Sequence, residues 1–152
     1  MLTFAGQVAG DLMSGFLSQY LHSRRKVILF FIFLSFIMVL IYLLAPIHDV
    51  STFYVVCVVL GLCNGYWTLF VTVAAELFGT NLRATVATTV PNFVRGAVIP
   101  LAAMFTFGKI YVGMVHSALI VAIVSFVLAL IALKYLEETF EKNLDYTEGD
   151  DV

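Results

Sequence analysis

Two charged residues of opposite sign lie inside long apolar stretches of this sequence. Asp11 is the only acid in the first stretch, and Arg95 is the only base in the fourth. A charge near the centre of a bilayer costs about 2.5–3.5 kcal/mol on insertion scales, so it is usually tied to a partner or to a polar pathway. If both stretches are membrane-spanning helices, with a rise of about 1.5 Å per residue, Asp11 and Arg95 lie at roughly the same depth. They then either pair or face one aqueous cavity.

A second pair of charges, Glu76 and Arg83, lies in the short polar segment between the third and fourth stretches. Glu76 closes one predicted helix, where the helix dipole is negative, and Arg83 opens the next, where it is positive. Each placement forgoes or reverses roughly 0.3–1 kcal/mol of dipole interaction. The two charges therefore either have partners elsewhere in the fold or are solvated loop charges.

The elements that hold these residues are predicted to be membrane helices. An apolar fraction of 62%, a charged fraction of 12% and a mean hydropathy of +1.03 exclude an ordinary soluble domain. Continuous apolar runs of roughly 20 residues are long enough to cross a bilayer, and their lack of alternation favours helices over a barrel. The sequence predicts an all-α membrane protein with five transmembrane helices, at about residues 2–20, 27–45, 53–75, 84–107 and 111–133.

Polar residues are spread unevenly over the five predicted helices. The first, third and fourth carry polar side chains at helical spacing, so we expect them to face protein or water, whereas the second and fifth are predicted to face lipid. Helix-to-helix packing alone is the alternative explanation for most of the Ser, Thr and Gly. Pro91 and Pro100 predict a break in the fourth helix around Arg95. Close helix approach is predicted at Gly6-x-x-x-Gly10 and at Gly61-x-x-x-Gly65.

The connecting segments predict the orientation. Arg24-Arg25-Lys26 lies between the first two helices, whereas residues 46–51, between the second and third, contain no Lys or Arg. The positive-inside rule places the Arg24 loop, the Glu76–Arg83 segment and the C-terminus in the cytoplasm of a multi-pass protein of the cell membrane. Residues 137–152 are predicted to be an acidic cytoplasmic tail, and residues 1–136 the membrane domain. Five helices then put the N-terminus outside, which predicts a chain that lacks its front.

Neither an enzyme nor a nucleic-acid-binding protein is predicted. The histidines lie on different predicted elements without metal-ligand spacing, and no nucleophile–base pair or glycine-rich phosphate loop is present. Cys57 and Cys63 lie six positions apart in one apolar stretch, where they face different directions and are expected to pack. We therefore expect no catalytic residues, no metal and no cofactor.

Four motifs make the chain similar to the C-terminal half of a major facilitator superfamily transporter, near the sugar porters and metabolite–proton symporters. Residues 15–26 look like the family's loop motif between helices 8 and 9, and Glu76 to Arg83 match its E-x6-R motif. Residues 92–97 resemble the helix 11 pattern, and residues 137–142 resemble the motif after helix 12. The resemblance implies that the five predicted helices are helices 8 to 12, and that helices 1 to 7 form a missing partner half.

This resemblance implies a secondary transporter that moves a small polar or anionic solute, such as a sugar or an organic acid, by alternating access, with proton coupling. Direct pairing of Asp11 with Arg95 is then less expected than a shared cavity. Arg95 would contact the solute or neutralise a carboxylate, and Asp11 would be the proton-coupling group. The remaining residues expected at the solute are Asn92, Asn64, Tyr66 and Trp67. For Trp67 the alternative is that it is a packing residue.

The resemblance also implies a cytoplasmic gate, which closes when the transporter faces out. Its residues would be Glu76, Arg83, Arg24, Arg25 and Glu138. The expected contacts are between Glu76 and Arg24 or Arg25, and between Arg83 and Glu137 or Glu138.

The alternative function belongs to another class. The chain could be a truncated membrane protein that does not transport, and that acts at most as a structural or interaction subunit in the lipid bilayer.

Overall fold

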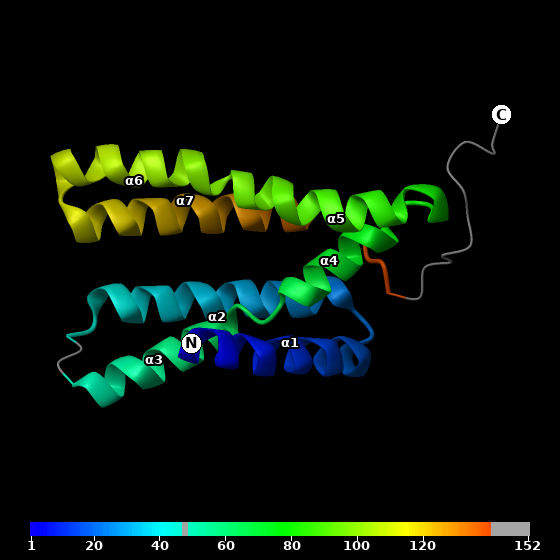
Figure 1. Cartoon of the computed structure of the whole chain (residues 1–152), viewed down its shortest axis with the longest axis horizontal. Coiled ribbons are helices and arrows are strands. Elements are labelled where there is room, and N and C mark those ends of the chain that lie inside the picture. Colours follow the sequence, from blue (N-terminus) through cyan, green and yellow to red (C-terminus); the bar gives the residue numbers. More distant parts are fainter. Residues whose placement is uncertain (47–48, 141–152) are drawn as a thin grey trace.

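The computed structural model describes residues 1–46 and 49–140. The described residues form helices joined by short connections, as the all-α prediction requires (Figure 1). The helices are α1 (Leu2–Leu21), α2 (Arg24–Leu44), α3 (Val50–Cys63), α4 (Trp67–Glu76), α5 (Thr80–Gly96), α6 (Val98–Val112) and α7 (Met114–Tyr135). Most of the predicted acidic tail, residues 141–152, lies outside the described residues.

Four helical stretches of the described chain are long and apolar enough to cross a membrane. They are α2, the consecutive pair α3 and α4, the consecutive pair α5 and α6, and α7. These stretches indicate a multi-pass membrane protein. The prediction of five such helices is confirmed for four, because α1 forms at the predicted place but is not among them. Its polar residues, which include Gln7, Asp11 and Gln19, make α1 less apolar than these four stretches.

Helix α2 begins three residues before its predicted start. Ser23 has an extended backbone, and its Oγ accepts a hydrogen bond from the backbone N–H of Lys26 at 3.3 Å. A serine in this position satisfies one of the free N–H groups of a first helical turn. The basic residues that were expected in a loop therefore form the first turn of α2.

The predicted third transmembrane helix is broken into α3 and α4 at residues 64–66. The backbone N–H of Asn64 bonds to Leu60 and Gly61, and that of Gly65 bonds to Leu62, so the chain ends α3 in a tight turn. Helix α4 then starts in a new direction (Figure 1). This break was not predicted.

The fourth transmembrane stretch is also broken, as predicted, and the boundary between α5 and α6 lies at Ala97. Pro100 has no N–H to donate to the carbonyl of Gly96, four residues before it, so helical bonding is interrupted there. Helix α6 continues to Val112, past the predicted end at residue 107. A single residue, Gly113, with φ of 83°, joins it to α7. This backbone conformation favours glycine.

Helices α1 and α3 cross at the two predicted glycine motifs. A Cβ atom added to Gly10 would lie 2.2 Å from the carbonyl oxygen of Leu62, and one added to Gly61 would lie 1.9 Å from that of Thr3. Side chains larger than hydrogen do not fit between the two backbones. The prediction of close helix approach at these motifs is confirmed.

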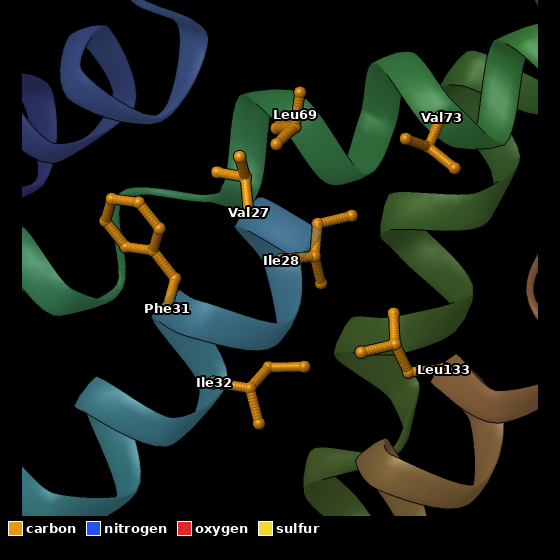
Figure 2. Packing of buried hydrophobic residues seen from close by; sticks show 7 residues of the cluster. All are labelled: Val27, Ile28, Phe31, Ile32, Leu69, Val73 and Leu133. Carbon is orange, nitrogen blue, oxygen red and sulfur yellow. The ribbon is translucent and has the colours of Figure 1, made fainter. Parts of the chain in front are cut away.

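The hydrophobic core centres on α2. Figure 2 shows Val27, Ile28, Phe31 and Ile32 of α2 packed among Leu69 and Val73 of α4 and Leu133 of α7. The prediction that this helix faces lipid rather than protein is therefore wrong, since α2 contacts α1, α3, α4 and α7. Helices α5 and α6, by contrast, contain no buried residue. An almost purely apolar helix can be central as well as peripheral, and composition alone does not separate the two.

The connections lie at two ends of the bundle. Figure 1 shows the α1–α2 turn, the α4–α5 turn and the C-terminal end of α7 together at one end, and the α6–α7 turn at the other. The segments expected to form the gate are therefore neighbours in the fold.

Candidate functional site

Asp11 lies where α1 meets the start of α4. Its Oδ1 accepts a hydrogen bond of 3.1 Å from the backbone N–H of Thr68, the second residue of α4. The first N–H groups of a helix lack partners within the helix and carry partial positive charge. Tyr66, the residue before α4, makes no side-chain cap. The Asp11 carboxylate supplies this cap from another helix, and the glycine crossing of α1 on α3 brings it there.

Arg95, which lies near the end of α5, contacts the same turn of α4. The Cζ atom of Arg95 lies 5.8 Å from the ring centroid of Trp67, within the range of a cation–π interaction. Its Nη1 donates a hydrogen bond of 3.4 Å to Oδ1 of Asn92, one turn earlier on α5. Asn92 in turn donates to the carbonyl of Thr88 at 3.0 Å. Arg95, Asn92 and Trp67 therefore form one cluster.

The two charges of the apolar stretches do not pair within the described part of the chain. Asp11 bonds to Thr68, and Arg95 stacks on Trp67, so they act on consecutive residues of α4. The sequence left two alternatives, a direct pair of Asp11 with Arg95 or one shared aqueous cavity, and the direct pair is excluded in this structure. The charge of Arg95 has no acidic partner among residues 1–46 and 49–140. The guanidinium is exposed, as are the other polar residues of its face of α5: Thr85, Thr88 and Asn92.

The remaining residues expected at the solute lie at the break before α4. Asn64 is exposed and closes α3. Tyr66 is half-buried, and its ring centroid lies 6.5 Å from that of Phe31 in the core. The ring of Trp67 packs on Phe70 at 5.6 Å, so Trp67 has a packing contact as well as the contact with Arg95. Tyr66 and Trp67 belong to one lining, and Asn64 does not.

That lining surrounds an apolar cavity of about 420 Å³ between α2, α4, α5 and α7. Its walls include Ile28, Val90, Val94 and Ala132, together with Tyr66 and Trp67. Known small-molecule pockets occupy about 300–1,000 Å³ and are mostly apolar, with a few polar groups at defined positions. The charged group next to this cavity is the Arg95 guanidinium. It lies at the edge, because Arg95 contacts the lining residue Trp67 and follows the lining residue Val94 in α5.

A buried ion pair joins two chain segments at the end of the bundle. Nη2 of Arg24 lies 2.5 Å from Oε1 of Glu76, and Glu76 is only 8% exposed. The other carboxylate oxygen, Oε2, accepts a hydrogen bond of 2.7 Å from Oγ1 of Thr139. The contact expected between Glu76 and Arg24 is present. Glu76 at the negative end of α4 and Arg24 at the positive end of α2 compensate each other.

Glu138 binds the amino end of α2. Its carboxylate accepts hydrogen bonds from Oγ of Ser23 and from the backbone N–H groups of Arg24, at 2.8 Å, and Arg25, at 3.4 Å. Desolvation alone would raise the pKa of Glu138. The hydrogen bonds from Ser23, Arg24, Phe140 and Arg25 outweigh it, and the pKa lies below its ordinary value.

The other two predicted gate residues make different contacts. Nη2 of Arg25 donates to the carbonyl of Lys134 at 3.1 Å. Arg83 donates from Nε to the carbonyl of Ala75 at 3.2 Å. Arg83 was expected to pair with Glu137 or Glu138. The Glu138 carboxylate binds the start of α2 instead, and the pairing of Arg83 with Glu137 stays a prediction.

Sequence reasoning missed two residues of this end cluster, Ser23 and Thr139. Ser23 had a local signal, since a serine directly before a helical run is a common cap. Thr139 had none, because its partner Glu76 lies 63 residues away in the sequence. Thr139 is 2% exposed.

No protein-family model matches the chain, and the searches of curated proteins and of solved structures give no match either.

Proposed function

We propose that this chain is part of a secondary transporter that binds a small anionic or polar solute at Arg95 and works by alternating access. The major facilitator superfamily, which its motifs resemble, is the proposed family. The observation that carries the proposal is the cluster of Arg95, Asn92 and Trp67. An arginine that has no acidic partner among the described residues lies there beside two helix breaks inside apolar stretches, and transporters commonly place binding groups at such breaks.

Asp11 offers a physical route for proton coupling in this proposal. A proton on Asp11 removes the negative charge that meets the amino end of α4. The first turn of α4 also holds Trp67, against which Arg95 stacks. Proton and solute would therefore act on the same turn of one helix. Coupling through that turn needs no contact between Asp11 and Arg95.

The end cluster is the proposed cytoplasmic gate. Arg24, Glu76 and Thr139 tie α2, α4 and the segment after α7 together. Opening that end of the bundle requires these contacts to separate. The face of α5 that carries Arg95 is exposed, which supports a further set of helices, outside these 152 residues, as the opposing half.

Trp67 is the only tryptophan in the sequence, so its fluorescence reports on the proposed site directly. The test is to titrate the chain in nanodiscs with small carboxylates and sugars. We expect a saturable change in emission with at least one anion, and its loss in Arg95→Gln. Lys109→Gln, which removes an exposed base on α6, is the matched control and should bind normally. Equal binding by Arg95→Gln would refute the proposal.

A structural or interaction subunit remains the second candidate, because α5 and α6 bury no residue against the rest of the chain. The two candidates differ in the titration above. A subunit without transport predicts no solute-dependent change in Trp67 emission in any variant.

A further inference from the structure

The cavity and the arginine at its edge together describe a more specific ligand than the proposed function requires. We infer that the site takes an amphipathic monocarboxylate, with its hydrocarbon body in the cavity and its carboxylate on Arg95. This inference rests on the proposed function, because it assumes that Arg95 is the anion-binding group.

The walls of the cavity favour a hydrocarbon body over a polyol. Most lining residues, among them Ile28, Val90 and Val94, have side chains that offer no hydrogen bonds. The lining side chains with a polar atom are those of Tyr66, with a hydroxyl, and Trp67, with an indole N–H. Burying a hydroxyl without a hydrogen bond is unfavourable, whereas moving a methylene group from water into an apolar cavity is favourable. A sugar placed in this cavity would lose the water contacts of several hydroxyls, and the lining replaces at most those that reach Tyr66 or Trp67. The lining therefore argues against the sugar branch of the proposal.

Arg95 supplies the charge that such a ligand needs. Within the described residues its guanidinium makes one hydrogen bond, from Nη1 to Asn92, which leaves most of its N–H donors for a ligand. Those donors form a planar fork that matches a carboxylate. Since the guanidinium lies over the Trp67 ring, which itself lines the cavity, head group and chain can bind at once.

The volume favours one chain. At ~30 Å³ for a group of the size of water, a cavity of about 420 Å³ holds roughly a dozen such groups. This is a single medium-length chain, such as that of decanoate. This volume does not enclose both acyl chains of a phospholipid. We therefore assign the ligand as a free carboxylate rather than a bilayer lipid.

The test uses quenching of Trp67 by a decanoate brominated at the chain end, with the full chain in nanodiscs of zwitterionic lipid. We expect saturable quenching that unlabelled decanoate reverses and that decanol, which lacks the charge, does not. Arg95→Gln should weaken decanoate binding about ten- to a hundredfold, the loss of a charge-assisted hydrogen bond. Linear, unsaturable quenching would mean partition into the bilayer and would overturn the inference. Equal competition by decanol would overturn it too.

A cavity-filling variant separates this inference from the proposed function. Ala132→Phe adds a ring to an exposed alanine of α7 that lines the cavity, and Ala103→Phe makes the same change on an exposed part of α6. We expect Ala132→Phe to weaken decanoate binding about tenfold and Ala103→Phe to leave it unchanged. If acetate binding depends on Arg95 but decanoate binding ignores Ala132→Phe, the proposed function stands and the inference fails.

Two more points complete the design of the test. The quenching of the unmodified protein needs no variant, so a failure of Ala132→Phe to fold does not protect the inference. Nanodiscs with anionic phospholipid provide the other arm. If that lipid abolishes decanoate binding, the occupant is a bilayer lipid and the inference is wrong.

Discussion

Individual carboxylates in this protein act on helix ends to which they do not belong. Asp11 of α1 caps the start of α4, and Glu138, after α7, caps the start of α2. In both places the acid meets free N–H groups and the positive end of a helix dipole. Glu76 is the exception. It lies at the negative end of α4, where Arg24 compensates its charge.

Removing the charge of Glu76 should destabilise the fold. Glu76→Gln leaves the Arg24 guanidinium, itself only 23% exposed, without its carboxylate. We expect a loss of about 1–3 kcal/mol in the free energy of unfolding, measured by denaturant titration of helical circular dichroism in detergent. Lys26→Gln, which removes an exposed charge from the same turn of α2, should change it little. Equal effects of the two variants would show that the ion pair contributes nothing specific.

The contacts of Glu138 should be sensitive to acid. Its pKa is lower in the folded protein than the ordinary value of 4.5, so the folded state binds the proton less readily than the unfolded state. The stabilisation is fully present above 4.5 and is lost as the pH falls through the folded pKa. The protection factors of the amides of residues 137–140, which correct for the slower intrinsic exchange in acid, should fall over that range. In Glu138→Gln the exchange should be faster at neutral pH, without this acid-dependent step.

The cap on α4 can be tested apart from proton coupling. Asp11→Asn keeps an oxygen that can accept from the Thr68 N–H, whereas Asp11→Ala removes it. We expect the alanine variant to lose about 0.5–2 kcal/mol of stability and the emission of Trp67 to shift. The asparagine variant should keep both near normal. An asparagine variant as damaged as the alanine variant would contradict a capping role for Asp11.

At the scale of elements, the crossing of α1 on α3 decides where Asp11 lies, and two glycines of α1 provide a matched test. A Cβ at Gly10 would lie 2.2 Å from a backbone oxygen, whereas one at Gly15 would meet no atom within 4 Å. Gly10→Ala should destabilise the protein by about 1–3 kcal/mol, because neither backbone can move away freely. Gly15→Ala should stabilise it by about 0.5–1 kcal/mol through helix propensity. Unfolding in detergent measures both, and destabilisation by Gly15→Ala would contradict this packing.

How far the sequence predicts these elements depends on the range of the responsible interaction. The break after Arg95 was predictable, because Pro100 removes a hydrogen bond whatever surrounds it. The close crossing of α1 and α3 was predictable from the glycine spacing. The break before α4 was missed, although Asn64-Gly65 is a known turn sequence, since it lies in a stretch otherwise suited to one long helix.

The sequence identified residues of the candidate site more readily than it identified the contacts between them. The types of Asp11, Arg95 and Trp67 marked them as unusual in apolar helices. Their meeting on the first turn of α4 depends on the break before that turn and on the packing of α1, and neither follows from spacing along one helix. The central place of α2 was hidden for a related reason. A helix of Ile, Phe and Leu reads the same whether lipid or protein surrounds it.

At the scale of the whole molecule, the arrangement of the helix ends predicts the sidedness of the loops. Lys26 and Glu137 belong to the end that carries the Arg24–Glu76 pair, and Asp49 and Met114 belong to the other. Single cysteines at these positions can be labelled in intact cells with a membrane-impermeant maleimide. We expect labelling at Asp49 and Met114, and at Lys26 and Glu137 only after permeabilisation.

The wild-type protein is the control for that experiment. Cys57 and Cys63 lie within α3, inside a stretch expected to be in the membrane, so the unmodified protein should stay unlabelled. Reaction of Asp49→Cys and Lys26→Cys from the same side would show that α2 does not cross the membrane.

The modest hydropathy of α1 bears on how the protein is made. Its polar residues set it apart from the four apolar stretches, and its Gly6 and Gly10 pack closely against α3, which is synthesised later. We therefore expect α1 to reach its final place only after Gly61 and Gly65 have been synthesised. We expect α2, which is strongly apolar, to insert into the bilayer first. We expect α1 to follow once α3 is present for it to pack against. The first helix of this chain would then be among the last to settle in the bilayer.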